Sequence, residues 1–366
     1  MSSTTPRWAY GAALAGLPFM GWDRLGALLA VGDGEPQRAW QRVRGGAAGA
    51  PWARAAAEVS VEAVAEAHTL GGVRVHLSDD AGYPAALVED HEAPPVLFSV
   101  GSLAALGDGV PRAGIIGTRR CTGYGRDVAR DLGKELSAAG VAVVSGLALG
   151  IDGAAHEGVL RAGPGGAPPI AVVGSGLDVV YPRRHASLWC QVTGSGVIIS
   201  EAPLGSRPEP WRFPARNRII AALCDVLVVV ESHRAGGSLH TVRSADERGV
   251  TVMAVPGSVR SPASSGTNRL LSEGCPPACD VDDVLVALAL ETAGAAVGSR
   301  RRDPRPMPTP ADAAVLELLG WEAVNLEEVL ARTGLAPGRL AAALTHLEQG
   351  GWARGTAGWW ERVAAP

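Results

Sequence analysis

Short runs of Val and Ile, separated by amphipathic segments, dominate the middle of the chain. Such runs occur at 114–117, 141–145, 170–174, 196–200, 225–231 and 250–257. Near-continuous apolar runs of this length are typical of strands buried on both faces of a sheet. The intervening segments 123–140 and 237–249 have a helical period and end at glycine, a common helix C-terminal signal. Strands that alternate with helices predict a doubly wound, mostly parallel α/β sheet over residues 72–292.

The residues before this sheet predict a small helical domain at 1–71. Apolar positions with a helical period recur there between Gly and Pro residues. The stretch 14–30 places a short turn between two apolar helical segments, a plan that resembles helix-hairpin-helix and SAM-like modules. The turn carries Phe19 and Met20, where a hairpin that contacts a DNA backbone usually carries small residues. A helical packing module is therefore favoured, and DNA contact is the alternative.

The residues after the sheet predict a linker and a second small domain. Residues 293–310 are rich in Pro and Arg and lack apolar periodicity, as linkers do. Residues 311–366 predict three short helices and then two short strands around a Gly turn, which together describe a winged-helix domain. Its third helix, at 337–350, offers Arg339 against Glu348. This pair provides little positive charge for entry into a DNA groove, which favours protein contact or a structural role over the reading of duplex DNA.

Length and charge fit this three-part organisation. The chain has 366 residues, 47% of them hydrophobic, and a formal net charge of −4 at pH 7. An acidic total argues against indiscriminate binding of polyanions, although it averages over all domains. Lys134 is the only lysine among 33 basic residues. Any bound anion must therefore be held by arginine side chains or backbone amides.

Cysteine usage and hydropathy predict a cytoplasmic protein without membrane insertion. The 5 cysteines are an odd number without regular spacing, which is typical of reduced thiols rather than a disulfide framework. The first residues lack the apolar run of a secretory signal. The longest apolar stretches, near 141–151 and 219–230, are interrupted by Ser145 and Asp225. Neither reaches the ~18 residues that a membrane span needs.

The turn after the first predicted parallel strand is a candidate anion site. Ligands of open α/β sheets collect at the carboxyl ends of the strands. Here Gly117, Arg119 and Arg120 precede a predicted helix, whose N-terminal amides attract anions. The turn has neither the dinucleotide-binding glycine spacing nor the lysine of a P-loop. We interpret it as a phosphate site, with tight helix packing as the alternative.

The turn after the second strand contains Gly146, Gly150, Asp152 and His156. Asp152 and His156 are separated by four residues and share one helix face. A metal pair or an acid/base couple is one interpretation. A structural role for both residues is favoured, because no third metal ligand can be placed beside them.

An arginine-rich segment at 207–218 is the most specific local feature. It contains Arg207, Arg212, Arg216 and Arg218 against Glu209, a local net charge of +3 inside an acidic protein. Two aromatic residues, at 211 and 213, stand among these charges. Arginine beside aromatics is the combination that pairs with phosphates and stacks on the bases of a single strand. The Gly/Ser turn at 231–241 can donate further amides and hydroxyls to the same ligand.

Together these segments resemble the DprA/Smf family of DNA-processing proteins. The resemblance rests on GIIGTRRCTGYG, VVSGLALGIDGAAHEGVL, IAVVGSGLDVVYP, GVIISEAPLG, FPARNRIIAALCDVLVVVES, GGSLHTVRSADERGVTVMAVPG and GTNRLLSEG, in the family's order. It implies an extended Rossmann-like domain with helical N-terminal and winged-helix C-terminal domains. It also implies a homodimer that binds single-stranded DNA and loads RecA recombinase in natural transformation or recombination.

The resemblance also implies the site residues. The expected DNA-binding residues are Arg119, Arg120, Arg212, Phe213, Arg216, Asn217, Arg218, Ser238 and Thr241. The expected pocket-shaping residues are Gly117, Gly146, Gly150, Asp152, Gly237 and Leu239. Gly237, His240 and Cys275 depart from the usual family pattern. Because the chain lacks other lysines, any lysine role in the pocket passes to Arg207 or Arg212.

An enzyme of the phosphoribohydrolase group, which cleaves nucleoside monophosphates on a related fold, is the alternative. Its hallmark loop P-G-G-x-G-T-x-x-E is replaced here by AGGSLHTVRSADE. The sequence offers neither a nucleophile with its base and orienting group nor a cluster of metal ligands. We therefore expect no catalysis, no metal and no cofactor.

Overall fold

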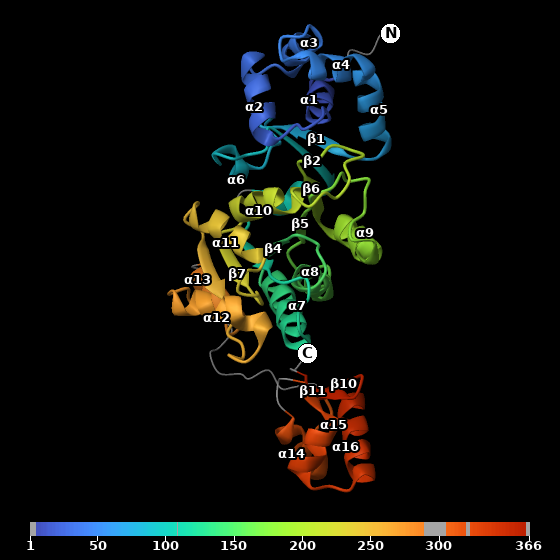
Figure 1. Cartoon of the computed structure of the whole chain (residues 1–366), viewed down its shortest axis with the longest axis vertical. Helices are drawn as coiled ribbons and strands as arrows, with labels where there is room; N and C mark the ends of the chain where they lie inside the picture. The colour runs from blue at the N-terminus through green and yellow to red at the C-terminus, as the bar shows by residue number, and fades with distance from the viewer. Residues whose placement is uncertain (1–4, 108, 289–304, 320–322, 364–366) are drawn as a thin grey trace.

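The computed structural model describes residues 5–107, 109–288, 305–319 and 323–363. N-terminal helices, a central α/β part and a C-terminal module follow one another along the long axis of the molecule (Figure 1). The predicted linker 293–310 lies outside the described residues up to residue 304. Within the described ranges, none of the helices combines the length and the apolar character of a membrane span.

The N-terminal helices share a core with the sheet beneath them. They are α1 (Arg7–Ala15), α2 (Trp22–Val31), α3 (Pro36–Arg44), α4 (Ala50–Glu58) and α5 (Val61–Leu70). Leu14, Trp40 and Val43 of these helices belong to one buried cluster with Phe98 and Ile198 of the sheet. The helices therefore pack on the α/β part through a continuous hydrophobic core rather than standing apart from it.

The central sheet has eight strands in the order β1-β2-β6-β5-β4-β3-β7-β8. They are β1 (Arg74–Leu77), β2 (Val96–Gly101), β3 (Arg112–Ile116), β4 (Ala142–Ser145), β5 (Ile170–Val172), β6 (Val197–Ser200), β7 (Val226–Val229) and β8 (Thr251–Ala254). All neighbours from β6 to β8 pair in parallel, which confirms the doubly wound α/β class. The antiparallel pairs β1-β2 and β2-β6 were not predicted, because a four-residue, partly exposed strand such as β1 has no continuous apolar run.

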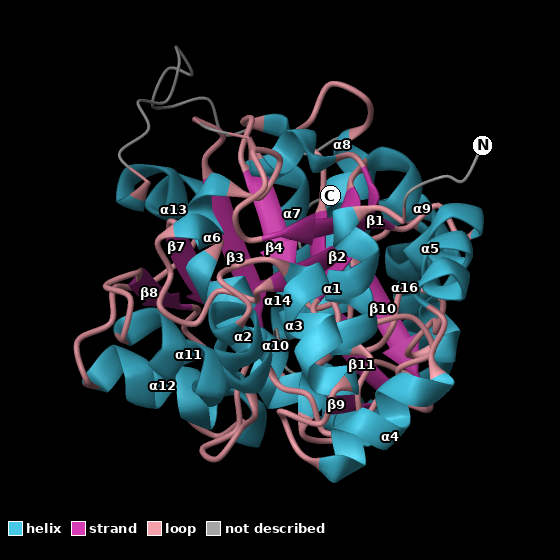
Figure 2. Ribbon diagram, turned by 90° about the horizontal axis from the view of Figure 1, so that it is seen from above, coloured by secondary structure: helices cyan, strands magenta, loops and turns pink. Residues whose placement is uncertain are grey.

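Helices cover both faces of the sheet (Figure 2). One face packs against α7 (Gly123–Ala138), α8 (Ile151–Ala162) and α13 (Val281–Ala287). The other packs against α10 (Arg212–Ala222), α11 (Ser238–Asp246) and α12 (Ser265–Ser272), while α9 (Ala186–Ser195) and the short α6 (Ala85–Val88) lie nearer the N-terminal part. The chain starts the parallel sheet at β3, moves outward through β4 to β6, and returns to the other side of β3 with β7.

The C-terminal module has the predicted winged-helix fold. It contains α14 (Pro310–Leu318), α15 (Leu326–Thr333) and α16 (Pro337–Gln349), with β9 (Val324–Asn325), β10 (Ala353–Thr356) and β11 (Trp359–Arg362). The strands form a separate three-stranded sheet in the order β10-β11-β9. Val315, Val329, Leu340 and Leu344 are buried in a core of the module's own. The strand β9 was not predicted, since two residues carry no detectable period.

A buried arginine fastens the segment before β2 to the end of α11. The Nε of Arg248 donates to Asp90 Oδ2 at 2.6 Å, and its Nη2 donates to Asp90 Oδ1 at 2.9 Å and to Glu92 Oε2 at 2.8 Å. The side chains of Arg248 and Asp90 are only 6% and 8% exposed. Burial raises the pKa of Asp90, but the hydrogen bonds and charge of Arg248 outweigh it, so the net pKa lies below its ordinary value.

Replacing Arg248 with methionine should lower the free energy of unfolding by about 3 to 5 kcal/mol at neutral pH, because it leaves buried carboxylates without a partner. Arg269→Met, which breaks an exposed pair with Glu273, should cost less than about 1 kcal/mol. Urea unfolding followed by circular dichroism measures both.

The cost of Arg248→Met should also depend on pH. The lowered folded pKa of Asp90 stabilises the native state above the unfolded pKa of about 3.9, and this contribution is lost as pH falls through the folded pKa. The difference between wild type and variant should therefore shrink below about pH 4. A difference that stayed constant down to the acid transition would contradict this role of Asp90.

Candidate nucleic-acid interface

A pocket opens at the carboxyl ends of the parallel strands, where the strand order reverses. Its walls come from the turn after β3, the turn after β4, the turn after β7 and the start of α10. In doubly wound sheets, ligands bind at this switch point because neighbouring loops leave in opposite directions and open a crevice. The cavity has a volume of about 760 Å³, ample for a nucleotide-sized ligand.

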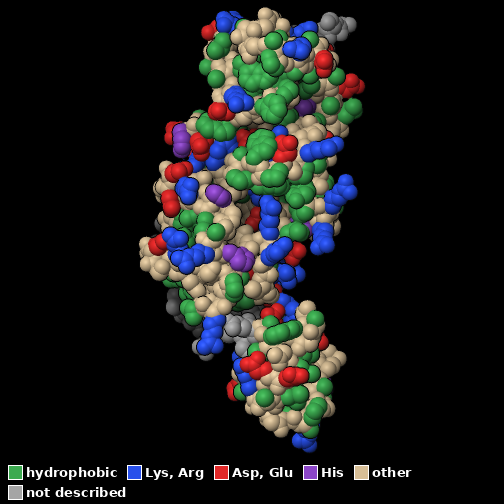
Figure 3. All heavy atoms as spheres, in the orientation of Figure 1, with side chains coloured by type: hydrophobic (Ala, Val, Ile, Leu, Met, Phe, Trp, Pro, Cys, Tyr) green, Lys and Arg blue, Asp and Glu red, His purple; other side chains and the backbone are tan. Residues whose placement is uncertain are grey.

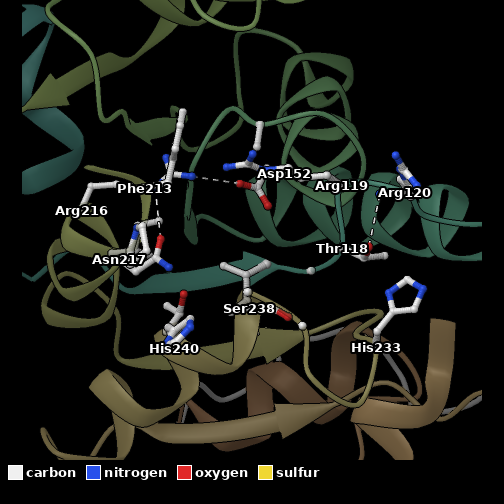
Figure 4. A pocket seen from close by; sticks show the side chains of 18 of the residues that line it. Thr118, Arg119, Arg120, Asp152, Phe213, Arg216, Asn217, His233, Ser238 and His240 are labelled. Atoms are coloured by element: carbon white, nitrogen blue, oxygen red, sulfur yellow. Dashed lines mark hydrogen bonds and ion pairs between the residues drawn. The ribbon is translucent and has the colours of Figure 1, made fainter. Parts of the chain in front are cut away.

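The structure brings most of the expected site residues into this pocket. Those that line it are Gly117, Arg119, Arg120, Asp152, Phe213, Arg216, Asn217, Gly237, Ser238 and Thr241. They come from segments more than 100 residues apart along the chain. Figure 4 shows Thr118, Arg120 and His233 on one side of the pocket, and Asn217 and His240 on the other.

Arg119 and Phe213 lie against each other in the wall of the pocket. The guanidinium carbon of Arg119 lies 4.5 Å from the centroid of the Phe213 ring, a cation–π contact. The Tyr181 ring also contacts the Phe213 ring, and the two ring centroids are 5.5 Å apart. Among the described residues, the exposed guanidinium groups of Arg119 and Arg120 have no ion-pair partner. A flat aromatic beside the Arg119 cation, in a pocket that the Arg120 cation also lines, suits a base and its phosphates.

Arg216 lines the pocket as a buried structural arginine. Its Nη1 donates to the carbonyl of Gly146 at 2.6 Å and to the carbonyl of Val172, and its Nη2 lies 3.6 Å from Asp152 Oδ2. A Cβ on Gly146 would overlap this guanidinium, so only glycine leaves room for it. Burial lowers the pKa of Arg216 to about 10, and the nearby Asp152 carboxylate favours its charged form. Arg216 therefore retains its charge, with several of its donors already engaged.

Asp152 and His156 have different surroundings. Asp152 faces the pocket beside Arg216; burial raises its pKa, while the charges of Arg216 and Arg119 oppose that rise. His156 is fully buried behind the pocket wall, and burial lowers its pKa to about 3, so its imidazole is neutral. In the part of the chain that the structure describes, no three His, Cys, Asp or Glu side chains converge as metal ligands.

Some of the amides around the start of α7 already donate to acceptors within the protein. Thr122 caps the helix by accepting from the Gly125 amide at 3.1 Å, and the buried Glu231 accepts from the Thr122 amide at 2.9 Å and from its hydroxyl at 2.6 Å. A carboxylate thus occupies part of the position expected for a phosphate, and phosphate binding by the remaining amides of this turn stays a prediction. Arg119 and Arg120, just before the helix, face the pocket instead.

Arg218 and Arg212 do not line the pocket, which corrects their expected place there. Arg218 is 5% exposed and forms a bidentate ion pair with Glu201, with N–O distances of 3.0 and 2.7 Å. Its guanidinium carbon also lies 5.3 Å from the centroid of the Trp22 ring. It thus holds α10 against β6 and the N-terminal helices. Arg212 pairs with Glu209 at 3.3 Å.

Three of the expected pocket-shaping residues do not line the pocket and instead support the residues that do. Gly150 has φ of +83°, and a Cβ there would overlap the Thr118 carbonyl, so glycine lets the turns after β3 and β4 touch. Gly146 accommodates Arg216, and Leu239 packs into the core under α11 rather than into the pocket.

The pocket also contains residues that were not among the expected site residues. They are Ile116, Thr118, Ala148, Tyr181, Pro208, Pro210, Pro214, Ile220, His233, Ala235, Gly236 and His240. Tyr181 comes from the loop after β5, within the motif IAVVGSGLDVVYP, whose aromatic end was a detectable signal. His240 stood out as a departure from the family pattern, and its exposed side chain faces the ligand space.

Comparisons with known proteins agree with this architecture. Residues 74–289 match the family model for DNA recombination-mediator protein A, and residues 299–358 match the model for the DprA winged helix domain. The DprA protein of Mycobacterium tuberculosis is 37% identical over 282 residues, covering 75% of this chain and 70% of that protein.

Two solved structures share the fold. The X-ray structure of DNA processing protein A from Streptococcus pneumoniae has a TM-score of 0.65 and 30% identity, covering 78% of this chain and 98% of that one. A Helicobacter pylori structure, described for its single-stranded DNA binding mode, has a TM-score of 0.53 and 28% identity, covering 59% of this chain and 95% of that one. The fold, its two matched domains and the extent of the identity place this chain in the DprA/Smf family of DNA-processing proteins.

Proposed function

We propose that this protein binds single-stranded DNA, without sequence preference, in the pocket between the turns after β3 and β7. The observation that carries this proposal is the Phe213 ring held under the Arg119 guanidinium in a pocket that Arg120 also lines. Aromatic faces stack on any base, and unpaired arginines attract the backbone phosphates. A structural relative binds single-stranded DNA, which supports the same ligand here.

Within the family role, we propose that the bound strand is protected and passed to RecA recombinase during natural transformation or recombination. The protein would act in the cytoplasm as a homodimer; its five cysteines are free thiols, as suits a reducing compartment. We also propose the functional division 1–71, 72–292 and 311–366, with 293–310 as the linker. The charges of Arg339 and Glu348 in the winged-helix α16 cancel, and this lack of net positive charge favours a protein partner over duplex DNA for that module.

We propose further that the pocket is not catalytic. Asp152 is the one carboxylate among the pocket-lining residues, and it is engaged with Arg216. A glycoside-cleaving pocket needs a carboxylate free to meet the sugar or an attacking water.

Arg119→Gln should weaken binding of a single-stranded oligonucleotide and lower the slope of log K against log salt by about 1, since one phosphate contact is lost. Arg161→Gln is the matched control, because this exposed arginine ends α8 at the opposite edge of the sheet. Fluorescence anisotropy over a salt series measures both variants. Equal slopes for Arg119→Gln and wild type would refute the phosphate contact.

Phe213→Ala should weaken binding by about 1 to 3 kcal/mol at every salt concentration, because a stacking surface is lost without a change of charge. Phe213→Tyr, which keeps the ring, should retain most of the affinity. The same anisotropy titrations apply. An alanine variant with wild-type affinity would mean that the strand does not enter this pocket.

Purified protein incubated with nucleoside monophosphates should release no free base, as followed by chromatography. Base release that disappears in Asp152→Asn would overturn the proposal and favour the phosphoribohydrolase alternative.

A further inference from the structure

Trp211 is a large aromatic residue that lies between pocket-lining residues in the sequence but does not itself line the pocket. It occupies the N-cap position of α10, between Pro210 and Arg212, and Pro210 and Phe213 both line the pocket. The residue is 52% exposed, although tryptophan usually buries most of its surface. Packing of the protein interior therefore does not account for half of this ring.

The Trp211 ring is nevertheless held in one orientation. The guanidinium carbon of Arg212 lies 4.4 Å from its centroid and covers one ring face. Its Nε1 donates to Glu209 Oε2 at 2.9 Å, and the same carboxylate accepts from Arg212 Nε at 3.3 Å. A stacking surface fixed in this way loses little conformational freedom when a base binds, which favours binding.

Trp211 faces the N-terminal helices through a separate small crevice. This crevice of about 50 Å³ runs from Trp211 and Arg212 to Met20, Gly21 and Trp22 at the start of α2. It is too narrow to enclose a base, so a ligand here must lie on the ring rather than inside the crevice. Arg207, exposed and without an ion-pair partner among the described residues, provides a cation on the same segment.

From this geometry we infer that Trp211 is a second base-stacking surface, which binds a nucleotide adjacent to those in the pocket on the same DNA strand. The strand would then leave the pocket over Pro210 toward the N-terminal helices, with a phosphate near Arg207. This inference rests on the proposed function, because it extends the same binding site. A fixed aromatic face with a cation on its segment has the chemistry of a sequence-independent single-strand platform.

The test is the affinity for oligothymidylates of increasing length, from about 4 to about 16 nucleotides, the range that such grooves cover. Wild-type affinity should rise in two stages, as first the pocket and then Trp211 are occupied. Trp211→Ala should match wild type on the shortest strands and bind the longer ones about tenfold more weakly. Trp211→Phe, which keeps a ring, should restore most of that gain.

The control variant is Trp359→Ala, which removes a tryptophan of similar exposure, 49%, from the winged-helix module. It should follow wild type at every length. Thermal melting of each variant checks that a loss of affinity is not a loss of folding, and Trp211→Phe tests the platform even where the alanine variant is unstable.

Photocrosslinking with a 5-iodouracil placed along the longer strand gives a second measurement. Crosslinks to the peptide containing Trp211 should appear at a position next to the one that crosslinks near Phe213. Wild-type affinity of Trp211→Ala at all lengths, with no such crosslink, would overturn this inference alone as long as Phe213→Ala still weakens binding. If Phe213→Ala also binds normally, the proposed function fails with it.

Discussion

The buried guanidinium of Arg216 is the interaction on which the pocket depends. It joins α10 to the carbonyl of Gly146 after β4, to the carbonyl of Val172 in β5, and to Asp152 at the start of α8. A buried charge is tolerated only when its donors are satisfied and a counter-charge is near, so this network specifies one position of α10 against the strand ends. That position places Phe213 over the pocket and in reach of Arg119.

Much of the fold could be predicted because it depends on local patterns. The Val and Ile runs placed the six parallel strands, and the glycines that end helical segments placed their connections. The antiparallel strand β1 was not predicted because it is short and partly exposed and depends on the N-terminal helices that pack over it, whereas β2 has a local apolar run at 96–98 that was missed. A local pattern of apolar residues does not show which distant element of the chain will pack against a strand.

The sequence predicted which residues belong to the candidate site better than it predicted the role of each charged residue. The segment 207–218 showed four arginines, but nothing local distinguishes one that faces a ligand from one that holds the fold. Arg218 is engaged by Glu201, 17 residues away, and Arg216 by carbonyls 44 and 70 residues away. Such partners are set by tertiary structure. The formal net charge of −4 gives the same weight to a buried, paired arginine as to the exposed Arg119 and Arg120 of the pocket. It therefore does not indicate which charges can meet a ligand.

The shared core of the N-terminal helices and the sheet has a consequence for how the chain is made. Strand β2 pairs with β6, Phe98 opposite Ser200, and the cluster under the helices includes Ile198. During synthesis, the first hundred or so residues therefore leave the ribosome well before the strand that completes their packing, and contacts of such sequence separation form slowly. The usual order, in which the N-terminal unit folds first and alone, does not apply. The apolar underside of these helices stays open to solvent, or to a chaperone, until β6 has emerged.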